Sequence, residues 1–153
     1  MNTLLPLLVV AVLLALVATA VKRVPTGQVV SVYRRGKRSR LLQPGTHFTL
    51  PLLDRVGHRI DLSGQVLRFE ESLRGEHDVR GTVYWQVLEP ERADAVIEQA
   101  DQLIRGGALS ALSQQPQAWE ADRRDLGAQL KHSMNQSLRE RGMMVTRVEL
   151  DIA

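Results

Sequence analysis

Residues 79–104 read VRGTVYWQVLEPERADAVIEQADQLI, and the hydrophobic period changes in the middle of this stretch. Over residues 79–87, apolar and polar side chains alternate and Tyr84 and Trp85 are present, which is typical of a half-buried β-strand. After Pro90 the apolar residues recur at intervals of three and four, which predicts an amphipathic helix to about Leu112. A strand that leads through Glu-Pro into a helix therefore forms the centre of the fold.

Upstream of this stretch, three segments have the composition of strands. They are QVVSVYRR (28–35), RVGHRIDL (55–62) and QVLRFE (65–70). The alternation in the second of these places Val56, His58, Ile60 and Leu62 on one inward face. Residues 71–77 are polar and contain a glycine, so we expect a loop there.

Downstream, a second helix is predicted from about Trp119 to Arg141, with Gly142 as its natural stop. Its apolar stripe consists of Trp119, Leu126, Leu130, Met134 and Leu138. Residues 145–152, VTRVELDI, close the chain as a strand. Strands, two helices and a final strand indicate an α+β domain, in which helices pack on an antiparallel-rich sheet.

At the N-terminus, residues 4–21 read LLPLLVVAVLLALVATAV and carry no charge. As a helix that rises about 1.5 Å per residue, this run is about 27 Å long, close to the hydrocarbon thickness of a bilayer. We therefore expect a transmembrane anchor. A cleaved secretory signal that ends near Ala18-Thr19-Ala20 is the competing interpretation, although no positive side chain precedes the run. A buried core helix is a third alternative.

Charge is distributed unevenly along the rest of the chain, although the formal net charge is only +3. Residues 22–59 carry nine Lys/Arg and one Asp, whereas residues 60–153 carry eleven Lys/Arg and sixteen Asp/Glu. Because basic flanks of a membrane segment stay in the cytoplasm, we expect the domain to be cytoplasmic. We expect the chain to be a single-pass protein of a bacterial plasma (inner) membrane. The chain has no cysteine, which excludes disulfides and thiolate metal sites.

Basic residues gather between positions 22 and 40, next to the expected anchor. Anionic lipid headgroups attract such residues by about 1 kcal/mol each near the surface. A solvated strand face with ordinary positive-inside bias is the equally weighted alternative. Nucleic acid is not an expected partner, because Tyr33 alone gives no stacking platform. The residues predicted to contact lipid headgroups are Lys22, Arg23, Arg34, Arg35, Lys37, Arg38 and Arg40.

No pattern of histidines or serines predicts catalysis or metal binding. The histidines have no metal-ligand spacing, and no serine lies in a G-x-S-x-G context. We expect a structural role for His47 in its turn, and for His58 as a hydrogen-bonded core residue. No catalytic residue, cofactor or metal ligand is therefore assigned, and no enzyme activity is expected.

Two carboxylates flank the strand at residues 55–62, and they admit two interpretations. Asp54 and Asp61 can be taken as an acid–base pair, or as partners of nearby arginines and backbone amides. The second interpretation is favoured, with Arg55 and Arg59 as the expected arginines.

Several short motifs occur in a characteristic order. They are Val24-Pro25-Thr26-Gly27, Arg34-Arg35-Gly36-Lys37, PGTHFTLP (44–51), Asp54-Arg55-Val56, GTVYWQVLEPERA (81–93) and ERGMMVTRVELDI (140–152). In this order they resemble the SPFH or band-7 family, which includes stomatins, prohibitins and flotillins. The resemblance covers nearly the whole chain and is strongest to the stomatin and slipin type.

The resemblance implies a transmembrane helix at residues 4–21 and an SPFH-like domain at residues 22–153. It implies a non-enzymatic, membrane-anchored scaffold that organises a membrane patch or modulates neighbouring membrane proteins. Such a scaffold would form homo- or hetero-oligomers with SPFH relatives on anionic lipid. An accessory regulator of a membrane-bound protease or transporter is the alternative.

Two features depart from the family pattern. Residues 71–78 are shorter than the corresponding loop, and SLRGEHDV (72–79) replaces the usual Thr-x-Asp lead. The sequence ends at Ala153, where relatives continue into a long helix that drives ring-like or cage-like assembly. We therefore expect a short form: a minimal member, a truncated one, or a subunit that needs a partner.

Overall fold

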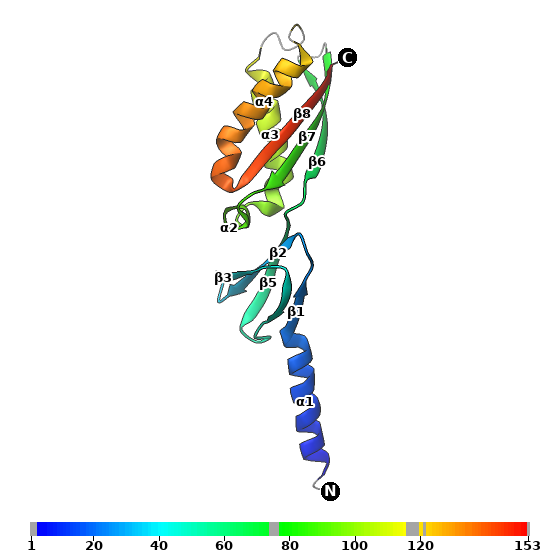
Figure 1. The fold of residues 1–153 in the computed structure, drawn as a ribbon, viewed down its shortest axis with the longest axis vertical. Coiled ribbons are helices and arrows are strands. Elements are labelled where there is room, and N and C mark those ends of the chain that lie inside the picture. Colours follow the sequence, from blue (N-terminus) through cyan, green and yellow to red (C-terminus); the bar gives the residue numbers. More distant parts are fainter. Residues whose placement is uncertain (1–2, 74–76, 116–119, 121, 153) are drawn as a thin grey trace. The chain divides into compact units, whose positions relative to one another are not determined.

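The computed structural model describes residues 3–73, 77–115, 120 and 122–152. It divides into two compact units, Met1–Asp61 and Leu62–Ala153, whose elements are labelled in Figure 1. Each unit has its own sheets and its own buried residues.

The first unit begins with helix α1 (Leu4–Ala20), which is apolar around its whole circumference and has no buried side chain. It ends one residue before the predicted segment 4–21, because Val21 pairs with Phe48 in a β-sheet. Among the described residues, no helix is long and apolar enough to cross a membrane. The transmembrane helix predicted at residues 4–21 is therefore not confirmed, since α1 has 17 residues.

Two small antiparallel sheets follow α1, one of two strands and one of three. The two-stranded sheet pairs β1 (Val21–Val24) with β4 (Gly45–Phe48), and the other has β2 (Gln28–Arg34) between β3 (Lys37–Leu42) and β5 (Asp54–Asp61). The core cluster of this unit consists of Val24, Val30, Val32 and Leu42. Strands β2 and β3 form an antiparallel hairpin, which is called the basic hairpin below because of its arginine and lysine residues.

The predicted inward face of residues 55–62 is only partly correct. Ile60 is fully buried, but Val56 is 41 % exposed. The pairing of β5 with β2 shifts register between Val30 and Val32, and such a bulge interrupts the regular alternation of side chains. His58 is half-buried, and its ring meets the Tyr33 ring edge-on with centroids 6.1 Å apart.

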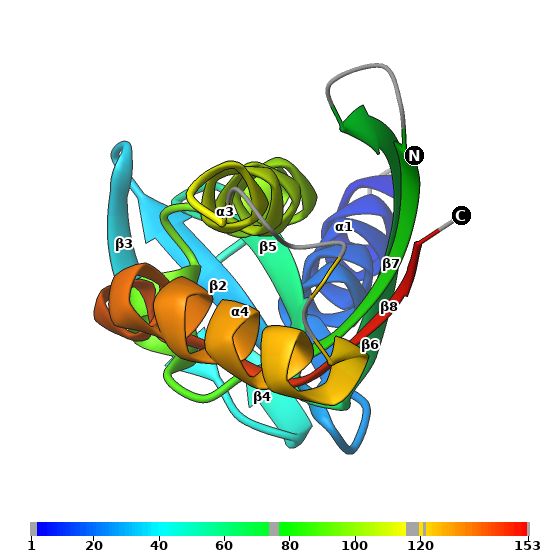
Figure 2. The same cartoon turned by 90° about the horizontal axis from the view of Figure 1, so that it is seen from above.

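The second unit is a three-stranded antiparallel sheet with helices packed against it. Its elements are β6 (Gln65–Leu73), β7 (His77–Val87), α2 (Pro90–Ala93), a 3₁₀ turn (Ile97–Gln99), α3 (Ala100–Ser113), α4 (Arg123–Leu138), a second 3₁₀ turn (Arg139–Arg141) and β8 (Met143–Ile152). The strand order is β6-β7-β8. Figure 2 shows α3 and α4 beside one another on one face of the sheet, with α4 alongside β8.

Regular alternation places one face of β7 against the helices. Val79, Val83, Trp85 and Val87 are buried there, as the sequence predicts. Gly81 lies on the same face, where the ring of Phe69 covers it from the neighbouring strand: a Cβ at Gly81 would lie 2.2 Å from that ring. The α+β class with an antiparallel sheet is therefore confirmed.

The second predicted helix is confirmed as α4. Its stripe of Leu126, Leu130, Met134 and Leu138 is buried, whereas Trp119 lies outside the described residues. The helix begins at Arg123 because Asp122 caps it, accepting a 3.0 Å hydrogen bond from the backbone N–H of Arg124.

The first predicted helix, from Pro90 to about Leu112, is interrupted. Val96 leaves the helical region, with φ −128° and ψ 3°, so that α2 and α3 are separated by a 3₁₀ turn. The loop predicted at residues 71–77 is wrong at both ends, because β6 continues to Leu73 and β7 begins at His77. Residues 74–76 lie outside the described part of the chain.

Candidate functional site

The seven basic residues singled out from the sequence are all exposed on the first unit. Lys22 and Arg23 lie on β1, and the other five lie on the β2–β3 hairpin, namely Arg34, Arg35, Lys37, Arg38 and Arg40. Arg35 and Gly36 form the hairpin turn with positive φ values of 53° and 77°. The structure therefore divides the set between two sheets and gathers most of it in one hairpin.

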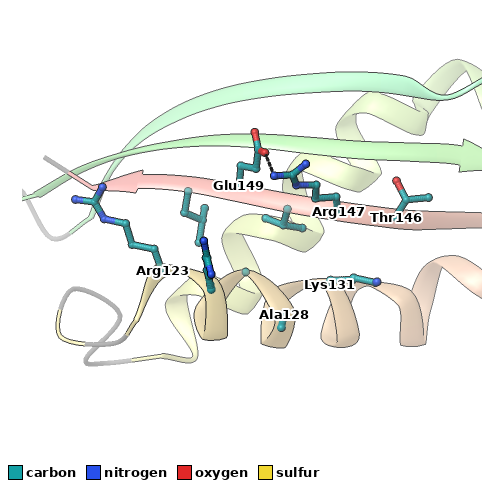
Figure 3. A pocket seen from close by; sticks show the side chains of 10 residues that line it. Arg123, Ala128, Lys131, Thr146, Arg147 and Glu149 are labelled. Atoms are coloured by element: carbon teal, nitrogen blue, oxygen red, sulfur yellow. Dashed lines mark ion pairs between the residues drawn. The ribbon is translucent and has the colours of Figure 1, made fainter.

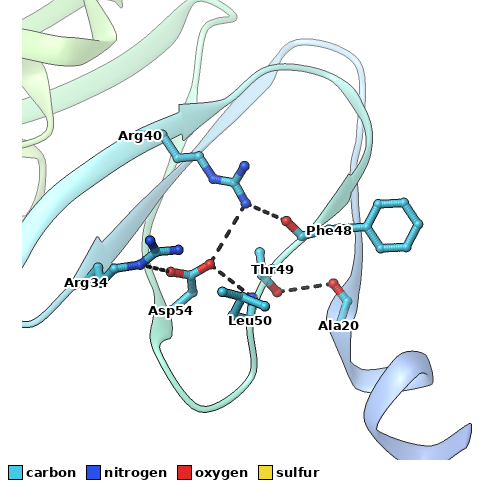
Figure 4. Close-up of polar contacts among 7 residues, drawn as sticks. All are labelled: Ala20, Arg34, Arg40, Phe48, Thr49, Leu50 and Asp54. Atoms are coloured by element: carbon cyan, nitrogen blue, oxygen red, sulfur yellow. Dashed lines mark hydrogen bonds and ion pairs between the residues drawn. The ribbon is translucent and has the colours of Figure 1, made fainter. Parts of the chain in front are cut away.

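Two of these arginines meet at Asp54, whose side chain is only 1 % exposed (Figure 4). Arg34 donates from Nε to Asp54 Oδ1 at 2.8 Å, and Arg40 Nη2 lies 3.9 Å from Oδ2. The backbone N–H of Leu50 donates to Oδ2 at 3.0 Å. Arg40 also donates to the carbonyl oxygen of Phe48. Asp54 therefore connects the basic hairpin to the segment that precedes β5.

These contacts hold the pKa of Asp54 below its ordinary value. The hydrogen bond from Arg34 contributes most, and the Leu50 amide follows. Desolvation of the carboxylate opposes the shift, but the donors and the positive charge of both arginines outweigh it. The carboxylate in turn raises the pKa of Arg34. Arg34 and Arg40 thus have a structural partner within the unit.

An apolar loop, residues 48–53 (FTLPLL), lies directly before Asp54. Four large apolar side chains are exposed on it: Phe48 at 69 %, Leu50 at 52 %, Leu52 at 90 % and Leu53 at 50 %. The loop has a defined backbone, because the N–H groups of Leu53 and Asp54 both donate to the Leu50 carbonyl, at 3.0 and 2.7 Å. A fixed turn therefore presents apolar side chains to the outside, which marks an interaction surface.

The apolar loop is joined to the end of α1. Thr49 is buried and donates twice to the carbonyl oxygen of Ala20, from its backbone N–H at 2.8 Å and from Oγ1 at 3.2 Å (Figure 4). Val21 and Phe48 are paired in the adjoining sheet. The apolar loop is therefore held at the C-terminal end of α1.

Reasoning from the sequence missed this loop. The available signal was four large apolar residues within six positions, beside a basic hairpin. The favoured interpretation of Asp54 is confirmed for the backbone amide, but its arginine partners are Arg34 and Arg40 in place of Arg55. Asp54 and Asp61 occupy opposite ends of β5, about 23 Å apart, and therefore cannot form an acid–base pair.

Across the described residues, no group of three or more His, Asp or Glu side chains converges to hold a metal ion. His47 has the structural position that was expected, since its Nε2 lies 2.7 Å from the Gln43 carbonyl oxygen across the turn. The apolar loop can form hydrophobic contacts and the basic hairpin can form ionic contacts, as the residues of a docking surface do.

Residues 22–151 match the model of the SPFH domain / Band 7 family. The match begins at the second residue of β1 and ends one residue before the end of β8. It therefore includes the basic hairpin, the apolar loop and all of the described second unit except Ile152.

Proposed function

The chain belongs to the SPFH domain / Band 7 family, which is of a membrane-associated, scaffold type, and from this premise we propose that it is a non-enzymatic scaffold anchored to a lipid bilayer by α1. The apolar loop at residues 48–53 rests against the same bilayer. The basic residues beside it contact anionic headgroups on the cytoplasmic side of a plasma membrane.

The observation that carries the proposal is the exposure of α1. Its apolar side chains surround the helix, and no part of the described chain buries any of them. A helix that is apolar on all sides is stable only when an apolar environment covers it. Its backbone hydrogen bonds are satisfied internally, so hydrocarbon can provide that cover. The short length of α1 is accommodated by local thinning of the bilayer at a modest cost.

The apolar loop and the basic residues next to α1 support the same placement of the first unit at a membrane surface. Thr49 fixes the apolar loop at the C-terminal end of α1, where a headgroup region would begin. Lys22 and Arg23 follow the helix directly on β1. Within the described residues, Lys22, Arg35 and Lys37 have no carboxylate partner, so they remain available to lipid phosphates. Arg34 and Arg40 instead stabilise the loop through Asp54.

Membrane attachment can be tested by floating the full chain, reconstituted in vesicles, through a density gradient after an alkaline carbonate wash. The variant Leu8→Lys/Val12→Lys places two charges on α1 and should lose at least about nine-tenths of the bound protein, because each buried Lys costs about 3 kcal/mol. Val66→Lys/Leu88→Lys replaces two exposed apolar residues of the second unit, at 54 % and 50 %, and should float normally.

Equal flotation of both variants would reject α1 as the anchor. The scaffold half of the proposal requires association, so the native mass of the detergent-extracted protein should exceed that of one chain. Recovery of one dominant integral protein in a pull-down would instead favour a dedicated regulator of a membrane-bound protease or transporter.

A further inference from the structure

A groove runs between α4 and β8 in the second unit (Figure 3). Its volume is about 500 Å³, and a second hollow of about 390 Å³ continues it along α4 past Lys131 to Arg139. The two elements touch at its base, where a Cβ on Gly127 would lie 2.7 Å from the Val148 carbonyl oxygen. An occupant would therefore lie along the seam between helix and strand and would not penetrate below it.

The walls of the groove are basic. Arg123 and Arg147 have partners: Arg123 Nη1 lies 3.1 Å from Asp151 Oδ1, and Arg147 Nη2 lies 2.5 Å from Glu149 Oε1. Arg124 and Lys131 also line the groove and are exposed. Neither of these two has an ion-pair partner anywhere in the described part of the chain. They therefore provide two available positive charges.

This positive surface stands out against its surroundings. Residues 62–153 contain eleven Lys/Arg and fifteen Asp/Glu, so the second unit has a net negative charge. Nevertheless, five of these eleven basic residues line the two adjoining hollows: Arg123, Arg124, Lys131, Arg139 and Arg147. Charge of one sign that lines a groove concentrates the electric field there and attracts an anionic partner to that place.

The shape and spacing favour an extended polypeptide. From Arg123 to Arg139 the helix rises about 24 Å, which an extended chain spans in about seven residues. Arg124, Lys131 and Arg139 are separated by about 11 Å along α4, and the nearest spacing that keeps side chains on one face of an extended peptide is about four residues. Carboxylates at that interval would meet one cation each.

Nucleic acid fits the groove less well. No Phe, Tyr or Trp lines either hollow, so no base-stacking platform is present. Glu149 lines the groove and Asp151 lies at its edge, where both would repel a continuous phosphate backbone. A peptide with separated acidic residues avoids these positions.

We propose that the α4–β8 groove binds an extended acidic segment of a partner protein, with Arg124 and Lys131 as its main contacts. This proposal specifies the kind of partner with which the proposed scaffold associates, and it rests on that part of the proposed function. It does not depend on attachment to a membrane. Its affinity should fall with added salt, because exposed charge pairs are screened.

The test uses the full chain in detergent micelles and a fluorescent peptide of about nine residues with Glu at every fourth position, so that the carboxylates share one face of the extended peptide. Anisotropy should show saturable binding at low ionic strength and much weaker binding of the matched Gln peptide. Arg124→Gln/Lys131→Gln should weaken binding at least about fivefold, as expected for two exposed ion pairs. Arg68→Gln/Arg105→Gln removes two exposed charges elsewhere in the unit and should change it less than about twofold.

The proposal is overturned if both double variants weaken binding equally, or if the Gln peptide binds as well as the Glu peptide. It is also overturned if a single-stranded oligonucleotide binds more tightly with the same dependence on Arg124 and Lys131. A change in native mass caused by the groove substitutions in the absence of any other protein would show that a second copy of this chain occupies the groove, and would overturn the proposal of a different partner. Vesicle flotation of the groove variant should be normal, which separates this test from that of membrane attachment.

Discussion

Arg34 and Asp54 are 20 positions apart in sequence, yet Arg34 Nε donates a 2.8 Å hydrogen bond to Asp54 Oδ1, and the Asp54 side chain is almost completely buried. The same carboxylate accepts from the Leu50 amide within the loop turn. The contact therefore links the basic hairpin to the apolar loop, and the two halves of the proposed membrane surface share one structural support.

The stability of the first unit should depend on the ionisation of Asp54. Its folded-state pKa is lowered, so the unfolded state takes up a proton first, near pH 4. The stabilisation is fully present above that value and is lost as the pH falls through the folded-state pKa. Thermal unfolding of the full chain should therefore show a midpoint that drops over this acidic range.

Asp54→Asn should lower the midpoint at neutral pH and flatten this part of the pH profile. Asp101→Asn alters an exposed carboxylate on α3 and serves as the control. An unchanged pH profile in Asp54→Asn would show that the carboxylate does not support the unit.

Gly142 should tolerate no side chain. It has a φ of 73°, and a Cβ there would lie 2.3 Å from the Glu89 carbonyl oxygen. Its own carbonyl accepts from the backbone N–H groups of Leu88 and Glu89 at 2.9 and 3.0 Å. Gly142→Ala should therefore lower the free energy of unfolding by about 1–3 kcal/mol, measured by urea denaturation.

Gly106 supplies the matched control for this glycine. It lies within α3, and a Cβ there meets nothing within 4 Å. Gly106→Ala should raise the free energy of unfolding by about 0.5–1 kcal/mol, because alanine loses less backbone entropy in a helix. Destabilisation by both substitutions to a similar degree would contradict the conformational argument.

The side-chain amide of Asn135 on α4 forms two hydrogen bonds with the backbone of β8. Its Nδ2 donates to the Val145 carbonyl at 2.9 Å, and its Oδ1 accepts from the Val145 N–H at 2.7 Å. Asn135→Ala leaves both buried backbone groups without these partners and should cost about 2–4 kcal/mol of unfolding free energy. Gln136→Ala, on the exposed side of α4, should change it by less than about 0.5 kcal/mol. A comparable effect at both positions would argue against the role of Asn135.

Local patterns predict much of the second unit. The stripe from Leu126 to Leu138 and the alternation of β7 follow directly from the periods of helix and strand, so both were recognisable. The break at Val96 depends on packing of the surrounding chain, which overrides a helical pattern. The exposure of Val56 depends on a register shift against another strand.

The candidate site was predictable only in part. The basic residues were visible as a cluster, but the pairing of Arg34 with Asp54 arises from the meeting of β2 and β5. Burial of Asp54 next to an exposed Leu52 reverses the usual preference of both residue types. The α4–β8 groove combines residues that are more than 20 positions apart, such as Arg124 and Arg147, so no local sequence motif predicts it.

The depth of residues in a bilayer tests the central claim most directly, and the absence of cysteine allows single spin labels to be introduced without background. Labels at Leu13→Cys on α1, Leu52→Cys on the apolar loop and Gln114→Cys after α3 should be compared in vesicles by collision with oxygen and with a polar nickel chelate. The account predicts that the label at Leu13 lies deep in hydrocarbon, that at Leu52 near the headgroups, and that at Gln114 in water. Labels at Leu13 and Leu52 that are as accessible to the nickel chelate as that at Gln114 would contradict it.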